Sequence, residues 1–108
     1  MKKIDIGDVQ LLVSYTLRHD VEEDDYELWV KQTAVPWWEN QPGFRSLRGF
    51  TTVVGSGARI TVQIDFDHLE SLSKVLGTGG FGDMRRELNR FAVDIDSRIL
   101  QPSGRPRG

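Results

Sequence analysis

The chain of 108 residues contains no cysteine and only two histidines, His19 and His68. Without cysteine it cannot form a disulfide, present a thiolate nucleophile or bind a metal through sulfur. Two histidines with no third ligand at a recognisable spacing make a poor metal site. We therefore expect no bound metal ion and no cysteine-dependent chemistry.

The chain also lacks a strong net charge and a long apolar run. Its formal net charge of -2 gives no field that would attract nucleic acid or an anionic membrane surface. No apolar run approaches the roughly 20 residues that a membrane helix needs, and Asp5 and Asp8 interrupt the region where a signal peptide would be apolar. We therefore expect a cytoplasmic protein with neither nucleic acid nor membrane as a partner.

Three segments carry apolar side chains at every second position, which is the period of a β-strand with one buried face. These segments are Val9–Arg18, Phe44–Val54 and Arg59–Phe66, and a shorter last strand is expected at Asp96–Gln101. The Gly-Ser-Gly sequence at positions 55–57 is typical of a hairpin turn between the second and third strands.

The segment Asp24–Phe44 holds all three tryptophans and follows a cluster of acids, which favours the start of a helix. Two apolar stripes run along this helix. The stripe expected to pack on the sheet contains Tyr26, Val30, Thr33 and Trp37, with Trp29 beside it, and the second stripe contains Leu28, Val35 and Trp38. Pro36 predicts a kink or a tightened turn near Val35, because proline removes a backbone donor.

A second helical region follows the third strand. Asp67 is the expected N-cap of a short helix through Leu76, and the glycine-rich run Gly77–Gly82 is expected to break it. A further helix is predicted from Gly82 to Val93, on a stripe that consists of Phe81, Met84, Leu88, Phe91 and Ile95. The run also matches the spacing G-x-G-x-x-G, but a helix precedes it, so a dinucleotide site is not expected; it remains a hypothetical lid over a cleft.

The order of elements is β-α-β-β-α-β, which predicts an α+β domain of the ferredoxin-like type with an antiparallel sheet. We expect a lead-in at residues 1–8, one domain at residues 9–102 and a flexible tail at residues 103–108. One sheet face should be bare yet half apolar, since it would present Leu12, Leu47, Val53 and Leu100. Such a face predicts a homodimer that forms through the sheet.

Four stretches of sequence carry a resemblance to a known group of proteins. They are LLVSYTLR, YELWVKQTAVPWW, QPGFRSLRGF and ITVQIDFDHLESLSKVL. Across Val9–Pro102 the chain resembles the dimeric α/β-barrel superfamily, with its antibiotic-biosynthesis-monooxygenase-like, EthD-like and NIPSNAP-like groups, and the small ferredoxin-like proteins of prodiginine-pigment pathways. The resemblance implies two sheets packed face to face in a homodimer, and a cleft between helices and sheet in each subunit.

The resemblance also implies a class of function. It favours a small-molecule enzyme that needs no cofactor and acts like a monooxygenase or a cyclase on an aromatic or polyketide-type compound. The haem-degrading relatives present a ligand histidine with a helical asparagine, and no helical histidine stands in a suitable place here, so haem is not expected. The alternative is a non-catalytic ligand-binding or self-association module.

Five residues are candidates for such a site. His19 is the candidate base, since a neutral imidazole accepts protons near neutral pH, and Arg48 is the candidate that would stabilise an enolate or phenolate. Tyr15, Trp37 and Trp38 are the candidate aromatic wall. Each also has an ordinary explanation: the histidine is exposed, the arginine forms interfacial ion pairs, and the aromatic residues pack in the core or at a subunit contact.

Overall fold

The computed structural model describes residues 8–102, so the expected tail and nearly all of the expected lead-in lie outside the described residues. In chain order the elements are β1 (Val9–Leu17), α1 (Glu23–Trp29), the π-helical segment η1 (Val30–Ala34), α2 (Val35–Glu39), β2 (Phe44–Thr51), β3 (Ile60–Phe66), α3 (Leu69–Leu76), α4 (Gly79–Leu88) and β4 (Ala92–Leu100).

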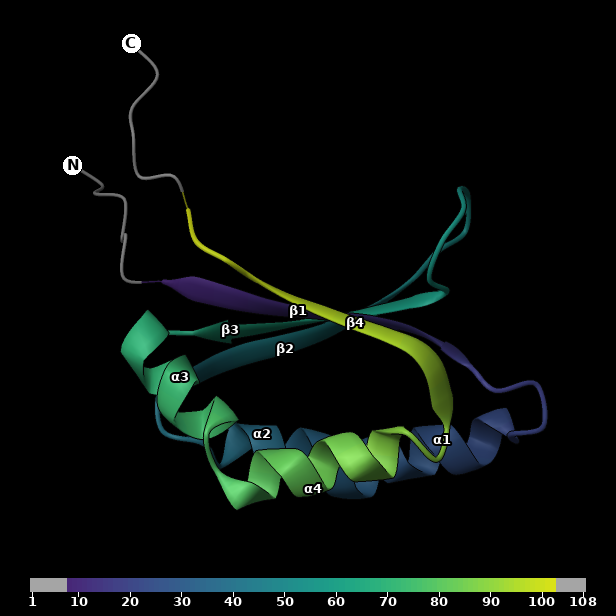
Figure 1. The fold of residues 1–108 in the computed structure, drawn as a ribbon, viewed down its shortest axis with the longest axis horizontal. Helices are drawn as coiled ribbons and strands as arrows, with labels where there is room; N and C mark the ends of the chain where they lie inside the picture. Colours follow the sequence, from purple (N-terminus) through teal and green to yellow (C-terminus); the bar gives the residue numbers. More distant parts are fainter. Residues whose placement is uncertain (1–7, 103–108) are drawn as a thin grey trace, which may run out of the picture.

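The four strands form one antiparallel sheet in the order β2-β3-β1-β4. All helices lie on one face of this sheet, and no described element covers the other face (Figure 1). We call these the covered face and the open face. The predicted ferredoxin-like α+β architecture is confirmed.

The alternation in β1 sets the position of the core. Val9, Leu11 and Tyr15 point to the covered face and are buried. They stand opposite Phe66, Ile64 and Ile60 of β3, which continue the apolar surface across the strand pair. Burial on this face of the two central strands is the main hydrophobic contribution to the fold.

The hairpin between β2 and β3 differs from its prediction. Strand β2 ends at Thr51, and the eight following residues form a long loop that leaves Val53 and Val54 89% and 91% exposed. The loop is closed by Thr52, whose N–H donates to the Arg59 carbonyl (2.8 Å) and whose hydroxyl donates to the Ala58 carbonyl (2.7 Å). Because the hydrogen bonds between the two strands stop at Thr52, Val53 and Val54 are not part of a strand.

The second helical region also has shifted boundaries. His68, not Asp67, precedes α3, and no side chain caps that helix. The break contains only Gly77 and Thr78, and the Thr78 hydroxyl accepts a bond from the Phe81 N–H (3.2 Å), so α4 already begins at Gly79. Most of the glycine-rich run is therefore the first turn of a helix and not a loop.

Strand β4 starts at Ala92, four residues earlier than predicted. The chain turns after Leu88, and the Phe91 carbonyl accepts from the Arg18 N–H (2.8 Å), which draws the segment to the end of β1. A β-bulge opposite Tyr15 then places Asp94 in the left-handed region, with φ of 56°. The prediction of a helix as far as Val93 is wrong here, because the bulge shifts the two-residue alternation of the strand.

The π-helical segment η1 changes which tryptophan is buried. The Val35 N–H donates to the Val30 carbonyl five residues earlier, so this turn contains one residue more than an α-helical turn. The inward face consequently continues through Ala34 and Trp38, both buried, instead of through Thr33 and Trp37. The predicted stripes are wrong from this turn onward.

Pro36 gives a physical reason for the wide turn. Proline has no N–H to donate, and its ring clashes with the carbonyl four residues earlier in a regular α-helix. A π-turn directly before the proline moves that carbonyl away. The irregularity predicted near Val35 is therefore present, but the turn is widened and not tightened.

Candidate functional site

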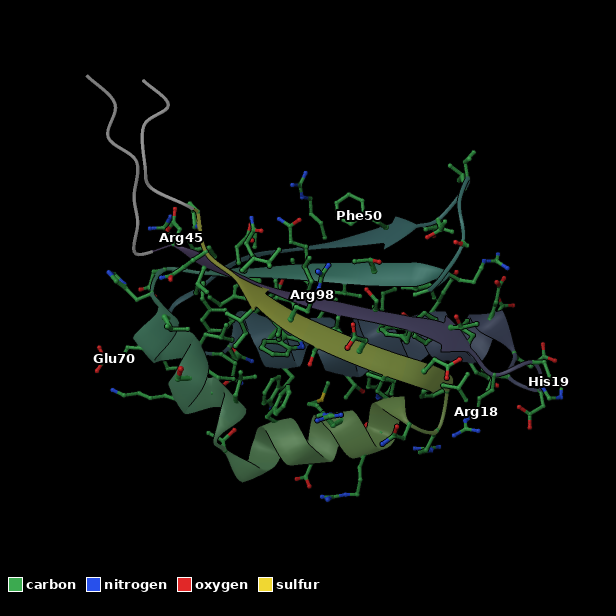
Figure 2. The ribbon with its side chains drawn as sticks, turned by 45° about the horizontal axis from the view of Figure 1, so that its top comes forward. Arg18, His19, Arg45, Phe50, Glu70 and Arg98 are labelled. Carbon is green, nitrogen blue, oxygen red and sulfur yellow. The ribbon has the colours of Figure 1, made fainter. Side chains whose placement is uncertain are left out.

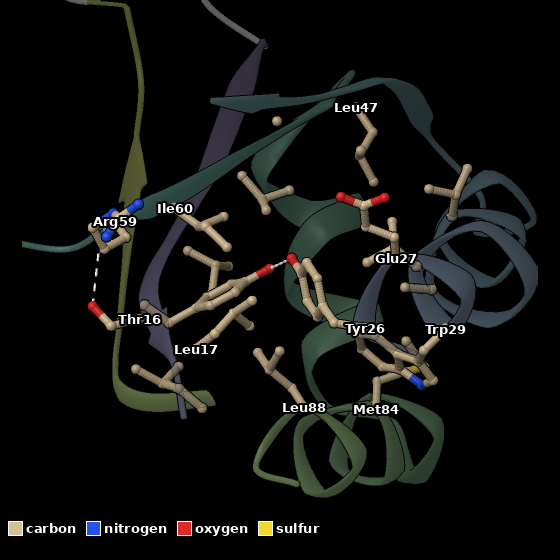
Figure 3. A pocket seen from close by; sticks show the side chains of 18 of the residues that line it. Thr16, Leu17, Tyr26, Glu27, Trp29, Leu47, Arg59, Ile60, Met84 and Leu88 are labelled. Atoms are coloured by element: carbon tan, nitrogen blue, oxygen red, sulfur yellow. Dashed lines mark hydrogen bonds between the residues drawn. The ribbon is translucent and has the colours of Figure 1, made fainter. Parts of the chain in front are cut away.

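A cavity of about 680 Å³ lies between the covered face of the sheet and the helices (Figure 3). Pockets that hold drug-sized ligands span roughly 300–1,000 Å³, so this space is large enough for a flat molecule of several rings. Most of its wall is apolar, and the apolar side chains include Val13, Leu17, Val30, Trp38, Leu47, Ile60, Val62, Phe81, Met84, Leu88 and Ile95.

The cavity adjoins both clusters of the hydrophobic core. One core cluster centres on Trp38, Phe66 and Leu72, and the other on Tyr15 and Tyr26. Residues of both clusters line the cavity wall. Val13 and Val62 pack against both clusters and also line the cavity, so packed side chains of the core hold its walls in place.

The buried hydroxyl groups of the cavity wall belong to a pair of tyrosines. The hydroxyl groups of Tyr15 on β1 and Tyr26 on α1 form a short hydrogen bond with each other (Figure 3). The two side chains are 3% and 8% exposed, and their rings meet edge to face with centroids 6.1 Å apart. Two hydroxyl groups carry two protons and their mutual bond uses only one, so one O–H remains to donate to a ligand.

Burial raises the pKa of both tyrosines above the ordinary value of 10.0. For Tyr15 the neighbouring Tyr26 raises the pKa further. For Tyr26 the bond from Tyr15 acts in the opposite direction, and the charge of Glu27 raises the pKa again. Both phenols are therefore neutral near neutral pH and act as hydrogen-bond donors, not as bases.

The raised pKa of Tyr15 predicts a loss of stability in alkali. Below pH 10 its phenol is protonated in both states, but above this value the unfolded chain releases a proton that the folded chain keeps. The free energy of unfolding should then fall by up to about 1.4 kcal/mol per pH unit from this residue. Denaturant titrations from about pH 9 to about pH 11 should show a flatter decline in Tyr15→Phe; equal slopes would contradict the burial of a neutral phenol.

Glu27 is an acidic residue at the rim of this cavity. It lies next to Tyr26 in sequence, is exposed, and points from α1 into the space between Tyr26 and Leu47 (Figure 3). The negative charge of its carboxylate contributes to the raised pKa of Tyr26, after the larger effect of burial. Among the described residues, Glu23 is the other carboxylate of the wall. A carboxylate beside a neutral phenol donor is a combination suited to moving a proton from carbon.

The position of Tyr26 is fixed by contacts between α1 and α4. The indole N–H of Trp29 donates to a carboxylate oxygen of Glu87 (2.7 Å), and the Trp29 ring also contacts Tyr26 and Phe91. These contacts hold α1 against α4, so the phenol is presented by packed elements and not by a loop.

The structure brings together only two of the five predicted site residues. Tyr15 and Trp38 line the cavity. His19 is exposed in the turn after β1, at the end of the sheet (Figure 2), and Arg48 lies on the open face with its guanidinium 5.6 Å from the Phe50 ring centroid. Trp37 borders Gly80 outside the cavity wall.

Three physical reasons explain the residues that are not in the wall. Arg48 follows Leu47, and neighbouring strand residues point to opposite faces. Trp37 is turned away by the extra residue of η1, and His19 lies past the last residue of its strand. Their predicted roles are untested, and His19, Trp37 and Arg48 do not line this cavity.

Sequence reasoning missed Tyr26 and Glu27 as site residues. The sequence contained a signal for Tyr26, because a tyrosine on a stripe that packs on the sheet needs a partner for its hydroxyl. The partner was also predictable, since Tyr15 points to the same covered face. For Glu27 no such signal existed, because it is one of several acids around the start of the helix.

Residues 8–102 contain no group of three histidine, aspartate or glutamate side chains placed to hold a metal ion. Within the same range, no helix has the length and apolar character required to span a membrane.

Comparisons with known proteins give matches among solved structures. No family model and no curated protein matches the chain. An EthD family protein from Bacillus halodurans superimposes with a TM-score of 0.69 at 18% identity, covering 88% of this chain and 98% of the other. A variant of SnoaB, described as a cofactor-independent oxygenase from Streptomyces nogalater, gives 0.73 at 13% identity, covering 90% and 94%.

A third structure bears on assembly. A dimeric protein of unknown function with a ferredoxin-like fold, from Bacteroides fragilis, gives a TM-score of 0.61 at 16% identity and covers 89% of this chain and 97% of the other. At such identities the likeness shows the fold and not the activity. The chain therefore has the ferredoxin-like fold of these proteins.

Proposed function

We propose that the protein binds a flat aromatic or polyketide-type small molecule in the cavity and acts on it without a cofactor, like a monooxygenase or a cyclase. The observation that carries this proposal is the buried Tyr15–Tyr26 pair, which has one O–H left to donate inside an apolar space of about 680 Å³. A buried donor of this kind selects a ligand oxygen, while charged wall residues such as Lys31, Arg59 and Arg85 are exposed.

The chemistry we infer is proton removal next to a carbonyl group. Glu27 takes a proton from the ligand carbon, and the electrons of that C–H bond form an enolate whose oxygen accepts the free phenol O–H. Donation to a developing oxyanion in a site of low polarity is worth far more than in water. The raised pKa of both tyrosines keeps their protons in place while the enolate forms.

Two outcomes of the enolate fit the proposal. In a cyclase, the enolate carbon attacks a second carbonyl group of the same ligand, and the new alkoxide takes back the proton that Glu27 holds. In a monooxygenase, the enolate carbon adds to dissolved O₂, the oxidant, and forms a peroxide. Loss of the second hydrogen of that carbon breaks the O–O bond, so one oxygen stays as a carbonyl group and the other leaves as water. The likeness to a protein described as a cofactor-independent oxygenase supports the second outcome.

Two of the five residues that the sequence suggested for the site keep a role in this proposal. Tyr15 belongs to the donor pair and Trp38 to the aromatic wall. The roles of base and anion stabiliser, first given to His19 and Arg48, are assigned to Glu27 and to the tyrosine pair, because these line the cavity.

Deuterium exchange of 2-tetralone tests this function. This flat bicyclic ketone has an enolisable CH₂ group between its ring and its carbonyl. We expect the protein to speed exchange at that carbon in D₂O, measured by proton NMR, by at least about 100-fold over buffer with an equal concentration of acetate. Binding without faster exchange would instead support the alternative, a non-catalytic ligand-binding module.

We also propose that two copies of the chain pair through the open face. In its central row Arg48, Gln63, Leu12 and Arg98 stand side by side across the four strands. Phe50 remains 46% exposed on this face, and Phe50 and Arg98 are seen there in Figure 2. Aromatic and aliphatic groups among pairable charges are typical of a subunit contact, and a structural neighbour is described as dimeric.

The pairing predicts a mass of about twice 12.3 kDa in solution. Leu12→Glu should shift the protein to the mass of a single chain, because it places a charge in the centre of the contact. Leu69→Glu is the matched control, since Leu69 is exposed on α3 in the helix layer. Light scattering after size-exclusion chromatography measures both, and a monomeric wild-type protein would contradict the pairing.

A further inference from the structure

The rim of the cavity has an unusual composition at one edge of the sheet. Strand β2 is an edge strand, and its residues Gly49 and Thr51 line the cavity while being exposed. The helical side contributes Glu27 and Lys31, which also line the cavity and are also exposed. Neither of these two charged residues forms an ion pair within residues 8–102.

Gly49 stands where the covered face would otherwise carry a side chain. It pairs with Val62 of β3, which in turn pairs with Val13 of β1, and both valines line the cavity. A Cβ atom added at Gly49 would meet no atom within 4 Å. The residue is therefore not required by crowding, and its backbone has no positive φ that would demand glycine.

A glycine inside a strand weakens the strand. Where packing does not require the glycine, another local feature explains it. Close approach of a ligand is such a feature. At Gly49 the missing side chain leaves a gap in the edge strand, on the covered face of the sheet, since the space that a Cβ atom would occupy is open there. Other wall positions of the sheet, such as Leu47 and Ile60, carry side chains of full size.

We propose that the ligand enters and leaves the cavity past the edge strand β2, through the gap at Gly49 and opposite Glu27 and Lys31. This inference rests on the proposed function and adds a specificity determinant to it. The gap admits flat ring systems and excludes ligands that are branched at the end that enters first. Because the route passes Glu27, the ligand's enolisable end reaches the carboxylate before the donor pair.

The test compares Gly49→Leu with a matched variant at the opposite edge. Ser97 on β4 is exposed, faces the covered side opposite Val13 and lines the cavity, so Ser97→Leu adds bulk at the other edge strand. The probe is 2-naphthol, whose ring and oxygen match the enol of 2-tetralone. Stopped-flow quenching of tryptophan emission follows its binding, since Trp38 is in the wall.

For Gly49→Leu we expect association and dissociation rates that both fall about tenfold, a Kd within about twofold of wild type, and a midpoint of thermal unfolding no lower than wild type. Ser97→Leu should slow association less than Gly49→Leu does, because the proposed route does not pass the opposite edge strand. Unchanged rates in Gly49→Leu, equal slowing in Ser97→Leu, or a weaker Kd at an unchanged association rate would each overturn the route while leaving the proposed function intact. Failure of wild type to bind 2-naphthol would overturn both.

Discussion

Replacing Glu27 with glutamine should lower the rate of deuterium exchange into 2-tetralone by about 10²–10⁴-fold, which is the usual contribution of a positioned general base. The amide keeps the size and most contacts of the side chain but cannot accept the proton. Because Glu27 is exposed at the rim and makes no described ion pair, the change should leave the fold intact.

Two further variants distinguish the effect of removing the base from the effect of other changes in the cavity wall. Glu23→Gln is the matched control, since Glu23 is the other carboxylate of the described wall and should keep the wild-type rate. Tyr26→Phe should retain the base but lose part of the donor pair, with a rate loss of about 10²-fold. If Glu27→Gln exchanges as fast as wild type, or if Glu23→Gln loses as much, the assignment of the base is wrong.

Replacing Trp38 with alanine should lower the free energy of unfolding by about 3–5 kcal/mol, the range found when a buried aromatic side chain is removed. Trp38 is 7% exposed, and its ring meets Phe66 and Phe81 edge to face, each with centroids 6.0 Å apart. The cavity already adjoins this residue, so its removal enlarges a void that the surroundings cannot fill.

Trp37 provides the comparison, because it is the same residue type one position earlier. It is only partly buried, against the core cluster and Gly80, so Trp37→Ala should be less destabilising than Trp38→Ala by at least about 1 kcal/mol. Urea titration measures both. If Trp37→Ala lowered the free energy of unfolding more than Trp38→Ala, the result would fit a regular helix and contradict the π-helical turn.

The architecture was predictable because strand alternation reports burial directly. In β1, Val9, Leu11 and Tyr15 repeat at two residues and lie on the covered face, so the sheet and the ferredoxin-like order followed from the sequence. The order in which the helix presents its tryptophans did not follow. A single π-turn before Pro36 adds one residue, and no periodicity computed for a regular helix contains that addition.

The site was less predictable than the fold for a related reason. Tyr15 could be placed on the correct face from β1 alone, but its partner Tyr26 comes from a helix whose distance from the sheet the sequence does not specify. Glu27 looked like one more of the acids around the helix start, although the acids of the first turn are Glu23, Asp24 and Asp25. His19 and Arg48 were predicted for the chemistry of their side chains. They lie outside the cavity because His19 follows the end of its strand and Arg48 points to the open face.

A crystal structure of the protein with 2-naphthol tests the central claim most directly, since it shows whether the cavity is the binding site. We predict that the ring system lies between the covered face and the helices, against Trp38, with its oxygen within hydrogen-bond distance of the Tyr15 or Tyr26 hydroxyl. Naphthol bound only on the open face, with Tyr15 and Tyr26 closed on each other and the cavity filled by repacked side chains, would contradict the account.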